Sequence, residues 1–176
     1  MPAIDQNSDK FPYRLYFNSI YRAAVKMAEL EKNDVVLDFG CGDRKLKQFL
    51  NGQEYIGYDA CQEFSDVKDY HQIKRADVVF VLHVLEHMTD EQIKEFVRWV
   101  IGIKPRKIIV SVPCEYLTNK IAAFILNRDF LHGLVHINHW KNIGRLLMER
   151  LELVEYKRVW MMQFVSVWII KNSKRG

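Results

Sequence analysis

The sequence has few cysteines, no long run of apolar residues and no strong excess of either charge. Its three cysteines, Cys41, Cys61 and Cys114, are odd in number and widely spaced, which excludes a disulfide framework and a paired-cysteine metal motif. The longest apolar candidate, residues 164–170, has the length of a strand and not of a membrane span. No basic start followed by an apolar run indicates a signal peptide. We therefore expect a cytoplasmic protein with no membrane partner.

What the chain does contain is an ordinary globular composition. Hydrophobic residues make up 49% and charged residues 27% of the 176 residues, enough for one domain with a real core. The net charge of +4 permits an anionic or nucleic-acid partner, but no dense Lys/Arg run inside the fold favours one. We expect a flexible N-terminus over 1–12, one domain over 13–171 and a solvated basic tail over 172–176. No pattern predicts an oligomeric state.

Short apolar runs alternate with segments of helical periodicity, which predicts an α/β fold with helices on both faces of a mostly parallel sheet. Strands are expected at 35–39, 54–58, 77–82 and 107–112, with a weak one near residue 67 and an antiparallel pair at 153–159 and 163–170. Helices are expected up to about residue 31, over 43–50, from a Thr89/Gln92 capping box to Gly102, and around 143–151. Residues 114–138 form an insertion. Ligands of such sheets bind beyond the carboxyl ends of the strands.

The first strand runs directly into Gly40-Cys41-Gly42. Glycines in such a turn let the backbone approach a ligand closely, although a strand followed by Gly-x-Gly is also a common plain turn. Asp59 ends the next strand, near the spacing at which a carboxylate accepts hydrogen bonds from ribose hydroxyls. Together the two features predict a cofactor that contains a nucleoside, and a carboxylate there disfavours a 2′-phosphate.

Three segments together resemble the class I S-adenosylmethionine-dependent methyltransferases. Residues 35–42 resemble their first motif, residues 55–59 their second strand with its ribose-binding acid, and residues 76–88 their fourth strand and following loop, in the form common among small-molecule methyltransferases. Residues 107–113 match their fifth strand. The resemblance covers about residues 13–171. It implies a single-domain, Rossmann-like methyltransferase fold, S-adenosyl-L-methionine as the cofactor, and a substrate lid over 114–138.

The resemblance also implies site residues. Asp38 would orient the amino group of the cofactor, Asp59 would bind the ribose, and Asp66 or Asp69 would approach the adenine. Arg44 stands where the family often has a third glycine. The implied cofactor-binding set is Asp38, Gly40, Cys41, Gly42, Asp59, Ala60, Asp66, Leu82 and His83.

Methyl transfer from a sulfonium mainly requires that the enzyme align the acceptor in line with the methyl group and exclude water. A general base is needed only where the acceptor must lose a proton. The catalytic candidates are His83 and Glu86, which the resemblance places in the site. Three later histidines, His132, His136 and His139, are expected at the surface or in structural roles. We expect a small-molecule acceptor and no metal.

Other functions fit parts of the pattern. Residues 83–87 form a His-x-x-Glu-His sequence, which on a helix would bind zinc for hydrolysis. The motif follows a buried strand directly and precedes the helix cap at Thr89, so a zinc hydrolase is disfavoured. A NAD-binding Rossmann protein would need a later glycine and would not predict residues 83–88. A cofactor-binding but non-catalytic regulatory domain stays open. Cys114, after Pro113, is assigned to packing or to a pocket.

Overall fold

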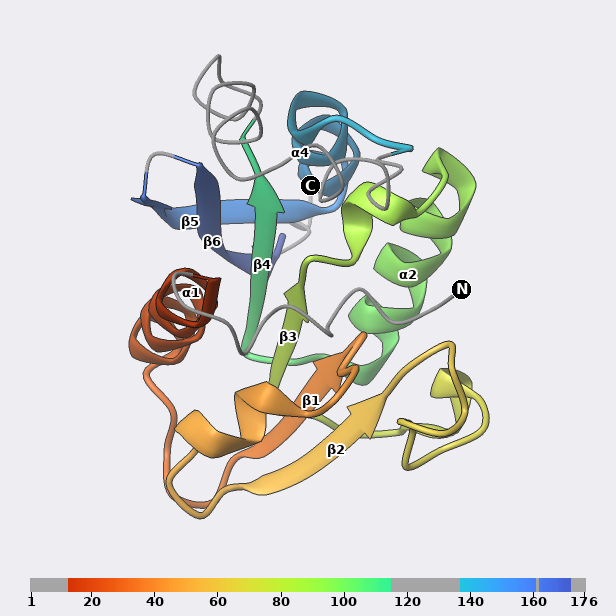
Figure 1. Ribbon diagram of the computed structural model, residues 1–176. Helices are drawn as coiled ribbons and strands as arrows, with labels where there is room; N and C mark the ends of the chain where they lie inside the picture. The colour runs from red at the N-terminus through yellow and green to blue at the C-terminus, as the bar shows by residue number, and fades with distance from the viewer. Residues whose placement is uncertain (1–12, 115–136, 161, 172–176) are drawn as a thin grey trace.

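The computed structural model describes residues 13–114, 137–160 and 162–171, and they build one mixed six-stranded sheet (Figure 1). The strand order is β2-β1-β3-β4-β6-β5. Strands β2, β1, β3 and β4 are parallel, β6 is antiparallel to β4, and β5 is antiparallel to β6. The bounds are β1 Val35–Phe39, β2 Glu54–Tyr58, β3 Val78–Leu82, β4 Lys107–Pro113, β5 Leu151–Val159 and β6 Gln163–Ile170. The predicted α/β fold is confirmed.

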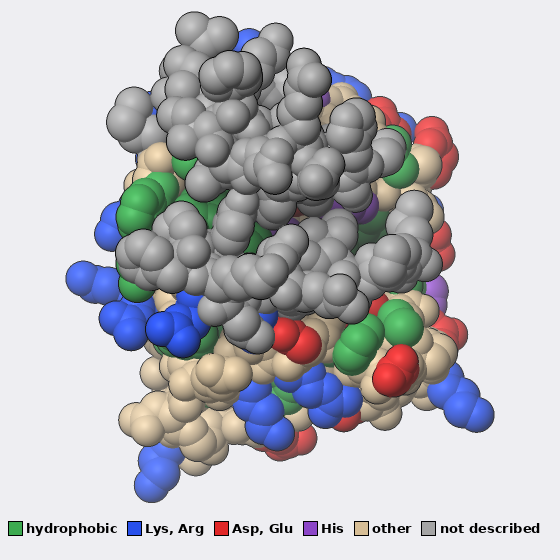
Figure 2. All heavy atoms as spheres, viewed as in Figure 1, with side chains coloured by type: hydrophobic (Ala, Val, Ile, Leu, Met, Phe, Trp, Pro, Cys, Tyr) green, Lys and Arg blue, Asp and Glu red, His purple; other side chains and the backbone are tan. Residues whose placement is uncertain are grey.

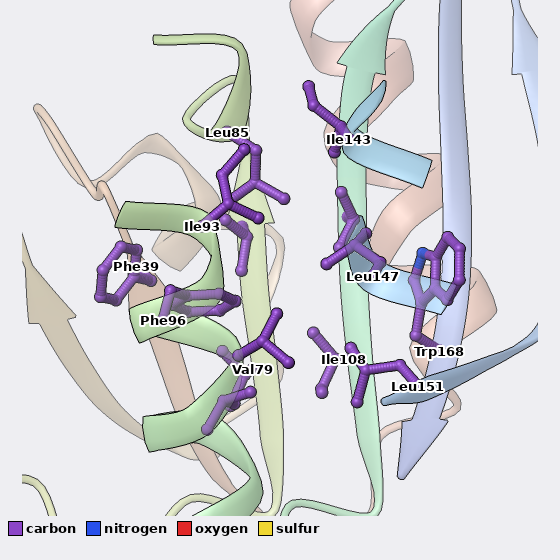
Figure 3. Close-up of a cluster of buried hydrophobic side chains, with 14 of the residues drawn as sticks. Phe39, Val79, Leu85, Ile93, Phe96, Ile108, Ile143, Leu147, Leu151 and Trp168 are labelled. Atoms are coloured by element: carbon purple, nitrogen blue, oxygen red, sulfur yellow. The ribbon is translucent and has the colours of Figure 1, made fainter. Parts of the chain in front are cut away.

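Helices cover both faces of this sheet. The longer ones are α1 Tyr13–Ala28, α2 Asp90–Ile103 and α4 Trp140–Met148, and the short 3-10 helices are η2 Lys45–Phe49, η3 Tyr70–Gln72 and η4 Leu85–His87. Helices α1 and η2 pack with Val36, Phe80 and Val165 on one face. On the other face, α2 and α4 enclose a second apolar cluster (Figure 3). None of the helices in the described part of the chain is long and apolar enough to cross a membrane.

The parallel strands form where the sequence is continuously apolar. Every residue of β1 and of β3 is buried, because helices exclude water from both faces. Burial of a side chain such as Phe96, which is fully enclosed between α2 and the sheet, contributes about 1.5–3 kcal/mol. The predicted capping box is present: Thr89 accepts from the Gln92 N–H while the Gln92 side chain accepts from the Thr89 N–H. This core therefore fixes the carboxyl ends of β1, β3 and β4 at one edge.

Four local expectations are wrong. No strand forms near Val67. The Asp66 N–H donates to the Gly57 carbonyl, and the Asp66 carboxylate accepts from the Gly57 N–H, so the segment meets β2 at a single residue. The predicted helix over 43–50 is the shorter 3-10 helix η2. Helix α1 ends at Ala28, where Glu29 takes a positive φ of 49°. Leu151 begins β5 instead of extending α4, yet it is fully buried in the same apolar cluster.

Several expectations lie outside the described residues. They are the flexible N-terminus over 1–12, nearly all of the insertion over 114–138 with His132 and His136, and the basic tail over 172–176. The proposed domain limits and the lid therefore stay predictions.

Candidate cofactor and acceptor site

The glycine turn and the end of β2 are held together by backbone hydrogen bonds. The N–H groups of Gly40 and Cys41 donate to the Tyr58 carbonyl oxygen at 2.7 and 3.0 Å. The Gly42 N–H donates to Asp59 Oδ2 at 2.9 Å, and the Cys61 N–H donates to Asp59 Oδ1 at 2.8 Å. The structure thus brings together the predicted turn and the predicted ribose-binding acid. Ala60, also in the predicted set, is exposed directly after Asp59.

The two glycines of this turn have different neighbours. Both have positive φ, 84° at Gly40 and 46° at Gly42, a conformation that suits glycine. A Cβ on Gly40 would lie 2.2 Å from Cγ2 of Val84, whereas nothing lies within 4 Å of a Cβ on Gly42. At Gly40 the Val84 side chain therefore occupies the space that a side chain would need. At Gly42 the corresponding space is open.

Arg44 takes the backbone conformation of the glycine that it replaces. Its φ is 61°, in the left-handed region. Its side chain turns away from the glycine turn: Nε and Nη2 donate to the Phe64 carbonyl oxygen at 3.1 and 2.9 Å, and Nη2 pairs with Asp66 at 2.8 Å. The guanidinium therefore braces the loop after β2 and does not crowd the turn.

The two acids expected near adenine are both engaged by other groups of the protein. Asp66 Oδ2 accepts from the Gly57 N–H at 2.7 Å, and Oδ1 pairs with Arg44. Asp69 caps η3 by accepting from the His71 N–H at 2.9 Å. Asp66 is held by β2 and Arg44 and Asp69 by η3, and an adenine contact by either acid stays a prediction.

Asp38 is a buried carboxyl group near the carboxyl end of β1. It is 4% exposed and accepts a hydrogen bond from the Tyr55 hydroxyl at 2.8 Å. Burial raises its pKa to about 7, the bond from Tyr55 opposes the shift, and the nearby Asp59 and Asp43 add to it. A cationic group beside Asp38 would favour the ionised form and lower this pKa again.

The loop after β3 carries two buried polar atoms that lack partners. His83 has a φ of 60°, donates its N–H to the Ser111 carbonyl at 3.1 Å, and packs its ring edge-on against Phe17 at 5.4 Å. Its Nδ1 lies 3.6 Å from Glu86 Oε1. Within the described residues, neither His83 Nε2 nor Glu86 Oε2 has a hydrogen-bond partner. Unsatisfied buried polar atoms cost stability, so they mark a place where a ligand or water is accommodated.

A buried polar chain beside this loop was not predicted from the sequence. The Tyr16 hydroxyl donates to Gln163 Oε1 at 3.2 Å, and Gln163 Nε2 donates to Ser111 Oγ at 2.7 Å. Gln163 and Ser111 are fully buried. Burial, followed by the nearby Cys114 and Glu86, raises the pKa of Tyr16, so its hydroxyl stays protonated. The available signal was a polar residue inside each of two apolar strands, β4 and β6.

The other residues that the sequence singled out are buried or make hydrogen bonds within the fold. Leu82 is buried at the end of β3, and Cys41 is buried with its thiol toward the Phe64 carbonyl at 3.3 Å. Cys114 is buried, and its N–H bonds the Met162 carbonyl. His139 caps α4 by accepting from the Lys141 N–H.

The zinc alternative requires His83 and His87 on one face of an α-helix. Here His83 lies in a left-handed turn and residues 85–87 form the 3-10 helix η4. Among the residues that the structure describes, no three His, Cys, Asp or Glu side chains group as metal ligands.

The comparisons with known proteins agree with this geometry. A family model described as a methyltransferase domain matches residues 11–149, and the chain belongs to that family. No curated protein matches the sequence. A SAM-dependent methyltransferase from Aquifex aeolicus is similar in structure, with 14% identity, coverage of 96% of this chain and 97% of that chain, and a TM-score of 0.68.

Two further methyltransferases of known structure are similar, one with a small molecule bound and one named for small RNA. The 1,6-didemethyltoxoflavin-N1-methyltransferase of Burkholderia thailandensis, bound to 1,6-didemethyltoxoflavin and S-adenosylhomocysteine, has 13% identity, covers 87% of this chain and 79% of its own, and has a TM-score of 0.62. The small RNA methyltransferase HEN1 has 18% identity, covers 89% of this chain and 25% of its own, and has a TM-score of 0.61.

At these identities the structures establish the fold, and the family establishes the class. The chain is a class I S-adenosylmethionine-dependent methyltransferase, and the predicted cofactor is confirmed. The NAD-binding alternative is excluded.

Proposed function

We propose that this methyltransferase binds its cofactor across the glycine turn and Asp59, and methylates a small-molecule acceptor held against His83 and Glu86. The observation that carries the proposal is the pair of buried, unpartnered atoms, His83 Nε2 and Glu86 Oε2, in the loop after β3.

The residues beside the turn fit the cofactor. Gly42 leaves open space, and each Asp59 oxygen already held by one N–H keeps a second lone pair for a ribose hydroxyl. Asp38, with its pKa near 7, suits a position beside the amino group of the methionine part, because a cation there returns the carboxyl to its charged form. When bound, the cofactor supplies a methyl group activated by its sulfonium.

His83 and Glu86 fit the acceptor side of the reaction. Nε2 of a neutral imidazole with a proton on Nδ1 accepts a hydrogen bond, so it can position an acceptor O–H or N–H and take its proton as the methyl group arrives. Glu86, 3.6 Å from Nδ1, favours this tautomer and stabilises the imidazolium that results. Phe17, packed on the His83 ring, keeps water away from that side.

A small acceptor fits better than a nucleic acid. Recognition of a phosphate backbone requires a basic stripe. On the face shown in Figure 2, Lys and Arg side chains of the described residues are spread along the lower part with Asp and Glu among them. The two unpartnered atoms are also buried, which suits a small ligand better than a large one. The methyltransferase that is similar in structure and bound to a toxoflavin precursor supports the same class of acceptor.

Cofactor binding is tested by calorimetric titration of S-adenosylhomocysteine into the wild type, Asp59→Ala and Glu63→Ala. Glu63 is an exposed acid of the same loop and serves as the matched control. We expect micromolar binding that Asp59→Ala weakens about tenfold or more, since two charge-assisted hydrogen bonds are lost, and that Glu63→Ala preserves. Equal affinity in all three proteins would show that Asp59 does not hold the ribose.

Catalysis is tested by transfer of a labelled methyl group to a panel of small phenols, amines and carboxylic acids. Once an acceptor is found, His83→Ala and Glu86→Gln should lower kcat by about 10²–10⁴-fold, the usual contribution of a general base, with little change in S-adenosylhomocysteine affinity. His71→Ala, at an exposed histidine, is the control. Tight cofactor binding with no transfer to any member of the panel would favour the non-catalytic regulatory domain.

A further inference from the structure

A recess lies between α4 and the β5–β6 hairpin, apart from the residues of the proposed reaction. It is a cavity of about 310 Å³, within the range of small-molecule pockets, and it is open to solvent on one side. Ile143, Leu147 and Trp168 form part of its wall and are seen on the α4 side of the core in Figure 3. Neither His83 nor Glu86 lines it.

The cavity exists partly because α4 has a glycine in its middle. Gly144 lines the cavity, and nothing lies within 4 Å of a Cβ built on it. Glycine is less favourable than alanine inside a helix, and α4 has only nine residues. An alanine would fit the space and strengthen the helix, so the glycine keeps space open at a cost in stability.

The walls of the cavity are aromatic and its own polar groups are satisfied. The rings of Trp140 and Phe164 lie 5.1 Å apart, and Trp168 closes the inner end. The Trp168 Nε1–H donates to Ser166 Oγ at 2.8 Å, and that hydroxyl donates to the Val110 carbonyl at 3.2 Å. An occupant therefore needs no hydrogen-bonding group on the part that lies inside, and a flat ring suits walls of this kind.

Two cationic side chains lie against aromatic rings of the cavity wall. The Arg158 guanidinium, which lines the cavity, lies 5.2 Å from the centre of the Phe164 ring, and Lys141 Nζ lies 5.8 Å from the centre of the Trp140 ring. Among the residues that the structure describes, no acidic side chain lines the cavity. Tyr156 at the rim is 63% exposed, an unusual amount of aromatic surface to leave in water beside an apolar recess. Charge complementarity therefore favours an anion at the mouth.

We propose that this cavity binds a small planar aromatic molecule that carries one carboxylate or a similar anionic group. The ring lies between Trp140, Phe164 and Trp168, and the anion faces Arg158. Gly144 provides the room for the ring. The site does not depend on the proposed acceptor chemistry, because it shares none of the residues assigned to it.

The test uses the full chain with two probes, 1-naphthoate and its neutral analogue 1-naphthalenemethanol. Binding is followed by calorimetry and by quenching of tryptophan fluorescence, to which Trp140 and Trp168 contribute. Gly144→Leu fills the cavity and should weaken both probes at least about 50-fold, since the ring has no other place to lie. Arg158→Gln should weaken naphthoate about tenfold and leave naphthalenemethanol unchanged.

Lys157→Gln is the matched control, because neighbouring residues of a strand face opposite sides of the sheet and Lys157 therefore points away from α4. It should bind both probes as the wild type does. Gly144→Ala adds one methyl group and should weaken naphthoate about threefold, and it provides the test if the leucine variant does not fold.

Three results would overturn the proposal. The first is that the wild type shows no saturable binding of naphthoate. The second is that naphthoate binds Gly144→Leu, or Gly144→Ala where only that variant folds, as tightly as the wild type, which would place it elsewhere, for example beside His83. The third is that Arg158→Gln weakens the neutral probe as much as the anion, which would show that Arg158 does not recognise the anionic group.

Discussion

The proposed cofactor half and the proposed acceptor half of the site lie along one edge of the sheet but satisfy their polar groups differently. Around the glycine turn, the Asp59 and Asp66 carboxylates accept from backbone N–H groups that lie 2, 9 and 17 positions away along the chain. Around the loop after β3, polar side chains from α1, β4 and β6 pair with one another, whereas His83 Nε2 and Glu86 Oε2 find no partner in the described part of the chain. The first half is preformed by local backbone, whereas the second depends on distant elements and leaves capacity for a ligand.

The largest expected effect is on the pH dependence of stability and concerns Asp38, a buried carboxyl of the cofactor half that accepts from the Tyr55 hydroxyl. The pKa of Asp38 is about 7 in the folded protein, well above its ordinary value of 3.8, so between these pH values the native state holds a proton that the unfolded state releases. The stability contributed by this proton is complete below pH 4 and is lost as the pH rises to 7, by as much as about 4 kcal/mol. Asp38→Asn should remove this loss.

The measurement is urea unfolding of both proteins from pH 4 to pH 8. The difference between the variant and the wild type should grow across that window, while the variant should bind S-adenosylhomocysteine more weakly. A difference that stays constant with pH would show that Asp38 is ionised throughout.

The next effect separates the two glycines. Gly40→Ala combines a left-handed backbone, about 1–2 kcal/mol, with a clash against Val84, about 1–3 kcal/mol, for a loss of roughly 2–5 kcal/mol. Gly42→Ala has only the backbone term of about 1–2 kcal/mol, and its methyl group would project into the space proposed for the cofactor. Denaturant unfolding should therefore rank Gly40→Ala as the less stable, and calorimetry should show weakened cofactor binding for Gly42→Ala. Equal stabilities would mean that Val84 moves aside freely.

A smaller effect probes the acceptor half. Gln163→Leu keeps the volume but leaves the Tyr16 hydroxyl and Ser111 Oγ without their partner, at a cost of about 1–3 kcal/mol. Adding Ser111→Ala should recover part of that loss, since one of the two orphaned groups is removed. Thermal unfolding of the single and double variants measures the coupling, and fully additive losses would mean that the chain is not a connected network.

The smallest expected effect is at Arg44. Arg44→Gly relieves a left-handed backbone but loses a half-exposed ion pair with Asp66, worth about 0–1 kcal/mol, so the two changes nearly offset. Stability should change by less than about 1 kcal/mol, and the loop after β2 should exchange its amide hydrogens faster. A large destabilisation would show that the Arg44 bonds to Phe64 hold the cofactor half together.

The parts that the sequence predicted are those with a local physical cause. Continuous apolar runs predict β1 and β3 because both faces are covered, and the Thr89 box fixes the start of α2. The glycine turn and Asp59 were found because a strand, a turn and a carboxylate follow in fixed order. The Tyr16–Gln163–Ser111 chain was missed because its hydrogen bonds span 147 and 52 positions, and no local pattern reports such pairs. The strand predicted near Val67 is wrong for the same reason, because the local apolar pattern does not show that Asp66 bonds to Gly57.

That pairing of Asp66 with Gly57 also bears on how the protein behaves in a crowded solution. Strand β2 is an outer strand, and an outer strand offers a row of backbone groups on which another chain can grow into an aggregate. Asp66 occupies the Gly57 N–H with its carboxylate and the Gly57 carbonyl with its own N–H, so an incoming strand must displace both bonds and meet a charged group. The opposite outer strand, β5, carries exposed charges at Glu152, Glu155 and Lys157. Both outer strands thus carry features that oppose the edge-to-edge association that leads to fibrils.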